Sequence, residues 1–194
     1  MDAGAGTRPA GAMSEAAGAE PVEFVADGLT FRVDPVTLRD SCTDPAGLAE
    51  FCDAHPTLPA TVAYLRMLGR LDEAEQRGRA TLPDSSDPAR RAAALARLAH
   101  VQQWQGRFDE ALATFEAALA DVEHLDHPRL HASVLQHRAK CRLDAGDLCG
   151  ALADARAALN LRRDADEDEI ASTRLLISVC DARARIGGER SDRR

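Results

Sequence analysis

Four residues able to bind a metal ion lie close together in the segment HLDHPRLH, namely His124, Asp126, His127 and His131. A zinc site of this kind needs two histidines on one helix face with a carboxylate nearby. Pro128 interrupts any helix through the segment, because proline lacks an N–H donor and its ring clashes with the preceding turn. We therefore expect a polar loop between helices here, and no metal site.

The five cysteines are Cys42, Cys52, Cys141, Cys149 and Cys180, and no Cys-x-x-Cys motif occurs. Their odd number and spacing favour reduced thiols over a disulfide framework. A bond between Cys42 and Cys52 stays open, because spacing in the sequence does not define disulfide geometry. The catalytic Gly-x-Ser-x-Gly, phosphate-loop and Gly-x-Gly-x-x-Gly patterns are also missing from the sequence. We expect neither an enzyme nor a bound cofactor.

The chain is acidic, with a formal net charge of -8 over 194 residues. Contacts from lysine and arginine to phosphates supply most nucleic-acid affinity, so this charge argues against nucleic acid and against an anionic membrane as partners. No apolar run is long enough to cross a bilayer. Residues 1–20 lack the pattern of a signal peptide and are expected to form a disordered tail, within which Met13 is an alternative start. A cytoplasmic location is expected.

Residues 21–55 are expected to form a β-hairpin followed by a short helix. Apolar and polar residues alternate on both sides of Asp27-Gly28, a pair typical of a tight hairpin turn. Asp44 and Pro45 suit the first positions of a helix over residues 43–55. A hairpin alone is only marginally stable, so it must pack on the helices that follow. Whether it caps those helices or occupies a groove between them stays open.

Residues 56–187 are predicted to form consecutive helices, and residues 188–194 a polar tail. The expected helices span 60–68, 71–82, 90–105, 108–125, 129–145, 148–162 and 170–186. Gly69, Gly106, Gly146 and Gly187 recur at intervals of 37 to 41 residues, each at the end of one helix. Glycine adopts the left-handed turn that lets the next helix fold back antiparallel. Aromatic residues make up only 4% of the chain, so a close-packed core of alanine and leucine is expected.

Three copies of one residue pattern repeat along these helices. The second copy carries Ala99, Gly106, Phe108, Ala111, Phe115 and Ala118. The third carries Ala139, Gly146, Leu148, Ala151, Ala155 and Ala158, and the first carries Val62, Gly69, Leu71, Ala74, Gly78 and Thr81. This pattern resembles the tetratricopeptide repeat family, although its usual period is 34 residues. The resemblance implies an all-α, right-handed superhelical array of antiparallel helix pairs, with about 3.5 repeats and the short N-terminal hairpin attached.

In that family the first helix of each pair lines a concave groove that binds peptides or partner helices. The residues that the resemblance places in the groove are Arg66, Arg97, His100, Gln103, Trp104, Gln136, Lys140, Arg174 and Asp181. Its basic members would receive an acidic segment of a protein or peptide. The paired asparagines of the family's carboxylate clamp are replaced by Ala63, His100 and Lys140, so a receptor for chaperone tails is not expected.

The sequence thus favours a non-enzymatic, bacterial, cytoplasmic adaptor or scaffold that binds a protein or peptide in its groove. One alternative is a regulatory domain that senses a ligand or peptide. Another is a structural module that self-associates through Leu176, Ile177 and Cys180 on the last helix. The identity of the partner, the pathway and the oligomeric state stay open.

Overall fold

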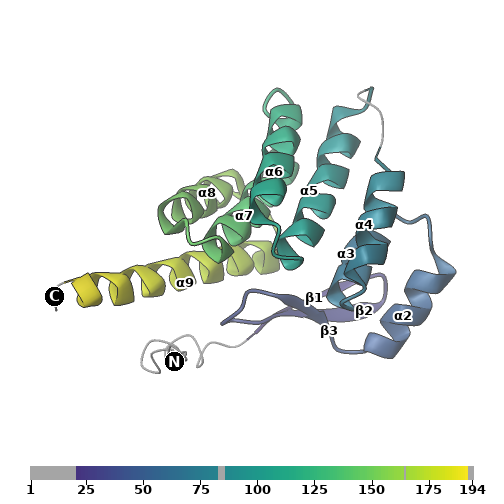
Figure 1. The fold of residues 1–194 in the computed structure, drawn as a ribbon, viewed down its shortest axis with the longest axis horizontal. Helices are drawn as coiled ribbons and strands as arrows, with labels where there is room; N and C mark the ends of the chain where they lie inside the picture. Colours follow the sequence, from purple (N-terminus) through teal and green to yellow (C-terminus); the bar gives the residue numbers. More distant parts are fainter. Residues whose placement is uncertain (1–20, 83–85, 164, 192–194) are drawn as a thin grey trace, which may run out of the picture.

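The computed structural model describes residues 21–82, 86–163 and 165–191 of the chain, and the side chains as far as residue 186. Within these residues the protein is mostly helical, with a short antiparallel sheet near its N-terminal end (Figure 1). The tail expected over residues 1–20 and the last residues of the expected C-terminal tail, 192–194, lie outside the described part.

The sheet contains the predicted hairpin and one strand more. β1 (Val22–Ala26) pairs with β2 (Leu29–Val33), and β2 pairs with β3 (Asp40–Cys42), both antiparallel. The hairpin turn is Asp27-Gly28, where both residues have positive φ. The third strand is too short to show an alternating pattern in the sequence. Its pairing places Asp40 opposite Val33 at the end of the sheet.

Helices occupy nearly all of the predicted positions. They are α2 (Pro45–Ala54), α3 (Thr61–Met67), α4 (Leu71–Ala80), α5 (Pro88–Trp104), α6 (Phe108–Val122), α7 (Pro128–Asp144), α8 (Leu148–Leu161) and α9 (Glu167–Ser191). Asp44 caps α2 as expected, since its carboxylate accepts a hydrogen bond from the amide of Gly47.

The predicted end of the last helix at Gly187 is wrong, because α9 continues to Ser191. Gly69, Gly106 and Gly146 adopt positive φ, as the sequence predicts. At each of these three positions the chain must reverse so that another helix can pack back. A glycine permits a left-handed turn but does not require one, and no described helix follows α9.

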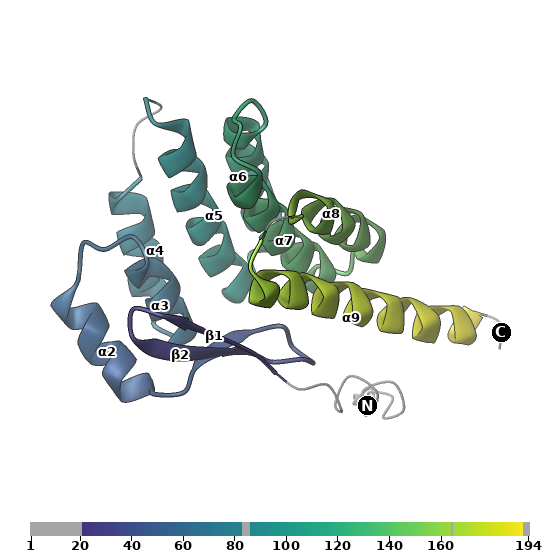
Figure 2. The same ribbon diagram turned by 180° about the vertical axis from the view of Figure 1, so that it is seen from behind.

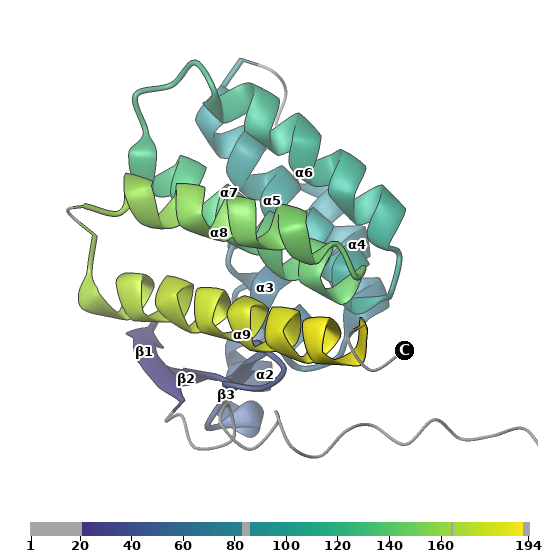
Figure 3. The same cartoon turned by 90° about the vertical axis from the view of Figure 1, so that its left-hand side faces the viewer.

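The helices stack as consecutive pairs, α3 with α4, α5 with α6 and α7 with α8 (Figure 1). The first helices α3, α5 and α7 contact one another in series, and α9 follows them against α7 and α8. Figure 2 shows the sheet between α2 and α9, across the ends of α3 and α5. Figure 3 shows β1 beneath the first part of α9, and the two elements are in contact. The sheet therefore covers one end of the inner face formed by the first helices.

Small and apolar side chains join these layers. Ala74, Ala111 and Ala151, at the same place in each repeat, are fully buried where two helices approach closely. A second cluster fixes the sheet to the helices, because Phe31 of β2 packs with Leu65 of α3 and other buried residues. The sheet is therefore part of the folded core.

The last helix does not present the self-association surface that the sequence suggests. Leu176 and Cys180 are fully buried in one cluster with Leu143 of α7, and Ile177 packs against it. The structural module proposed on that face is therefore not supported, since its residues already fill the core of the single chain.

Replacing Gly106 with alanine should lower the free energy of unfolding by about 1–2 kcal/mol, measured by urea denaturation, because φ is 79° there. A Cβ at Gly106 would meet no atom within 4 Å, so the loss comes from the backbone alone. Gly106→Asn should cost less, because asparagine tolerates the left-handed region better. Equal stability of Gly106→Ala and the wild type would contradict this account of the turn.

Candidate ligand-binding cavity

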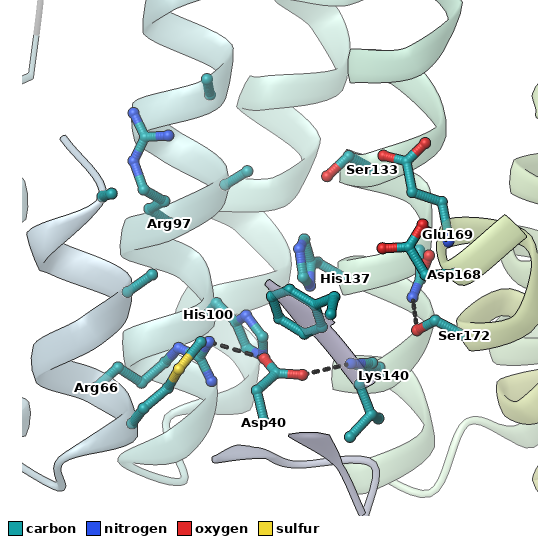
Figure 4. Close-up of a pocket in the computed structure, with 18 of the residues that line it drawn as sticks. Asp40, Arg66, Arg97, His100, Ser133, His137, Lys140, Asp168, Glu169 and Ser172 are labelled. Atoms are coloured by element: carbon teal, nitrogen blue, oxygen red, sulfur yellow. Dashed lines mark hydrogen bonds and ion pairs between the residues drawn. The ribbon is translucent and has the colours of Figure 1, made fainter. Parts of the chain in front are cut away.

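A cavity of about 470 Å³ lies between the sheet and the inner face of the helices (Figure 4). Each first helix contributes polar side chains to its lining: Arg66 from α3, Arg97 and His100 from α5, and Ser133, His137 and Lys140 from α7. Four of the six, Arg66, Arg97, His100 and Lys140, are residues that the sequence assigns to the groove. The start of α9 and the sheet complete the walls.

Asp40 of the sheet sits between two cations of this face. Its carboxylate lies 2.9 Å from Nη2 of Arg66 and 3.3 Å from Nζ of Lys140. All three residues are buried, with exposed fractions of 8%, 2% and 4%. Burial alone would raise the pKa of Asp40, but the charges of Lys140 and Arg66 outweigh it and hold that pKa well below its usual range.

The sheet, which includes the hairpin, thus occupies part of the groove. Its strand β3 supplies the acidic residue Asp40 there. The sequence predicts Arg66 and Lys140 as receivers of an acidic partner, whereas the structure pairs both with Asp40 (Figure 4). Asp40 carries no recognisable signal in the sequence, because it reaches these cations through contacts between distant parts of the chain.

Two further contacts attach the sheet to the helices. The ring of Trp104 lies between two guanidinium groups, 4.6 Å from Arg39 of the sheet region and 4.5 Å from Arg66. The hydroxyl of Tyr64 on α3 donates a 2.5 Å hydrogen bond to Asp27 of the hairpin turn. Trp104, predicted as a partner-binding residue, does not line the cavity and instead holds the sheet in place.

Arg97 differs from Arg66 and Lys140. It is partly buried and lines the cavity, and it makes no hydrogen bond or ion pair with any described residue. Figure 4 shows it away from the Asp40 cluster, with no interaction drawn to its guanidinium. Burial lowers its pKa, but arginine stays charged at any physiological pH. The cavity therefore contains an unneutralised positive charge.

The two histidines of the cavity are neutral near pH 7. Their rings lie 4.5 Å apart, on neighbouring helices. Burial is the main cause that lowers the pKa of His137 to about 3 and that of His100 well below 6.5, and Arg66 and Lys140 add to it. Nδ1 of His137 and Nη1 of Arg66 are buried without a hydrogen-bond partner among the described residues.

The predicted glutamines connect neighbouring helix pairs. Nε2 of Gln103 donates to Asp144, at 2.8 Å, and Gln103 does not line the cavity. Nε2 of Gln136 donates to Ser172 of α9, also at 2.8 Å, at the cavity wall. Both side chains thus help to hold consecutive repeats together.

Arg174 and Asp181 lie outside the cavity on α9, where Arg174 is exposed and Asp181 is partly buried. Their nearest ion-pair partners are Glu167 at 3.7 Å and Arg156 at 3.9 Å. The residues of α9 that do face the cavity are Asp168, Glu169 and Ser172, which the sequence does not single out. In the sequence, the acidic residues at the start of α9 indicate only the N-terminus of a helix.

The histidine-rich segment forms a helix start. Nδ1 of His127 accepts a hydrogen bond from the amide of Leu130, 3.3 Å away, and so caps α7 directly before Pro128. In the described ranges no group of three potential ligands has the arrangement of a metal site. The five cysteines are all free, which answers the open question about Cys42 and Cys52.

Comparison with protein-family models, with curated proteins and with solved structures finds no match to this chain. No helix in the described part is long and apolar enough to span a membrane. The resemblance to tetratricopeptide repeats therefore rests on the repeated residues themselves, and the function must be argued from the cavity.

Replacing Asp40 with asparagine should lower the free energy of unfolding by about 3–5 kcal/mol, because Arg66 and Lys140 would be buried without a counter-charge. Asp53→Asn is the matched control, since the Asp53 side chain is 64% exposed beside Arg70. It should cost less than about 1 kcal/mol. Urea denaturation at pH 7 measures both, and equal losses in the two variants would contradict the role given to Asp40.

The protein should lose stability as the pH falls from about 6.5 towards 3. Unfolded histidine binds a proton near pH 6.5, whereas folded His137 does so only at about 3. The unfolded state therefore binds more protons over this interval, and its free energy falls relative to the folded state. Histidine NMR signals recorded against pH should show His137 still neutral at pH 5. A His137 midpoint near 6.5 would contradict its burial as a neutral group.

Proposed function

We propose that this chain is a non-enzymatic binding protein, an adaptor built as a tetratricopeptide-like array over residues 56–187. Its ligand is an acidic segment of a protein or peptide, taken at the concave face of the first helices. The left-handed glycine turns and the buried alanines support the array, since both recur at equivalent places in three helix pairs. The common lining of the cavity by α3, α5 and α7 supports the concave face.

The proposal of an acidic ligand rests mainly on the guanidinium of Arg97, which pairs with no described residue. Arg66 and Lys140 already pair with the carboxylate of Asp40 and are only 2% and 4% exposed, so a second acid has little access to them. Arg97 has no such partner in the part of the chain that the structure describes, although it is partly buried. A carboxylate can accept two parallel hydrogen bonds from a guanidinium, which makes this a strong and directional contact.

The shape of the site restricts where the acidic segment lies. The sheet covers the end of the first helices that holds Arg66, Trp104 and Lys140. Ala93 and Ser133 line the cavity from the turns of α5 and α7 that precede this end. The acidic side chain is therefore proposed to contact Arg97 from the uncovered end of the cavity.

Replacing Arg97 with glutamate should abolish capture of the partner from a lysate of the source cells, because the variant presents a negative charge to an acidic segment. Arg90→Glu, on the same helix, is the control: the Arg90 side chain is 81% exposed, and it does not line the cavity. It should capture the same partner as the wild type.

Affinity capture read by mass spectrometry compares the three proteins, and circular dichroism checks that all keep their helicity. A partner retained by Arg97→Glu would place the binding surface elsewhere. Reversal of Lys140 would not be informative, because it would place a second carboxylate beside Asp40 in the core.

A further inference from the structure

The attached sheet prevents an extended chain from running along the whole groove. Asp40, Trp104 and Tyr64 attach the sheet at separate points, and Phe31 and Val33 of β2 are buried, with 0% and 2% of their surface exposed. Displacing the sheet would expose this apolar core and separate two buried ion pairs. The remaining volume, about 470 Å³, lies in the range of sites for small molecules.

The composition of the lining also fits a small molecule. Val22 and Phe24 from β1, Met67 from α3 and Leu130 from α7 supply apolar surface around the cavity. A few polar groups converge on the same space, above all the guanidinium of Arg97. Small-molecule sites typically combine a mostly apolar lining with a few polar groups that fix the orientation of the ligand.

The contacts of the charged lining residues leave Arg97 as the place for the negative charge of a ligand. Arg66 and Lys140 pair with Asp40, and Arg162 donates a hydrogen bond to the carbonyl of Glu169. The carboxylate of Glu169 also lies 3.3 Å from Arg129, outside the cavity. Among the described residues Arg97 has no ion-pair partner, so a carboxylate is expected to bind there.

We propose that the cavity is a binding site for a small organic monocarboxylate, whose carboxylate pairs with Arg97 and whose hydrocarbon part contacts Phe24, Met67 and Leu130. This site goes beyond the proposed adaptor function and does not depend on it. One consequence does rest on that function: the small carboxylate and the acidic segment of a partner compete for Arg97.

The test uses the purified full chain and isothermal titration calorimetry, with hexanoate and 3-phenylpropionate as probes. Their neutral amides, hexanamide and 3-phenylpropionamide, have nearly the same shape, and inorganic phosphate tests the second charge. We expect saturable binding of at least one carboxylate, at least ~10-fold tighter than its amide, because a charge-assisted pair is lost in the amide. Phosphate should bind more weakly than that carboxylate.

Three variants test the location. Arg97→Met should weaken binding of the carboxylate at least ~10-fold, whereas Arg90→Met should leave it unchanged. Ala93→Leu keeps every charge but fills part of the cavity, and it should also weaken binding. Circular dichroism and thermal melting confirm that each variant is folded before it is titrated.

The proposal would be overturned by any of three results: no saturable binding of either carboxylate, equal binding of acid and amide, or unchanged binding in Arg97→Met. These titrations contain no partner protein. Their failure is therefore distinguishable from failure of the adaptor function, which affinity capture alone tests.

Discussion

The carboxylate of Asp40, held between Arg66 and Lys140, is the interaction on which the arrangement of this protein depends. Asp40 pairs with Arg66, which lies 26 residues further along the sequence on the first helix pair. It also pairs with Lys140, which lies 100 residues further along on the third helix pair. A buried charge is tolerated only when it is paired, so the sheet cannot leave this position without leaving both cations unpaired. One strand thereby bridges the first and third helix pairs.

The same interaction divides the concave face into two parts with different chemistry. At the end covered by the sheet, Arg66 and Lys140 share the carboxylate of Asp40 in a region of low exposure. Arg97 lies about one helical turn from His100 and outside this cluster, so its charge is left for a ligand. The first part stabilises the fold, and the second is the proposed binding site.

Repetition explains which parts of this arrangement the sequence predicts. The glycine turns and the inward faces of α3, α5 and α7 follow from a local pattern, so the sequence places Arg66, Arg97, His100 and Lys140 on one surface. Asp40 lies in a three-residue strand without periodicity, and its partners are remote. No described second helix follows α9 to complete another copy of the repeated pattern, so the sequence does not define which face of α9 points inward. The residues of α9 at the cavity are therefore Asp168 and Ser172 and not the predicted Arg174 and Asp181.

The most direct test of this account is a double-mutant cycle between Asp40 and Lys140. It compares the free energies of unfolding of the wild type, Asp40→Asn, Lys140→Met and the double variant. If the two groups form the buried pair described, their coupling energy should be about 1.5–3 kcal/mol, as for neighbouring residues in one ionic network. Additive losses, within about 0.5 kcal/mol, would show that Asp40 does not hold the sheet to the helices.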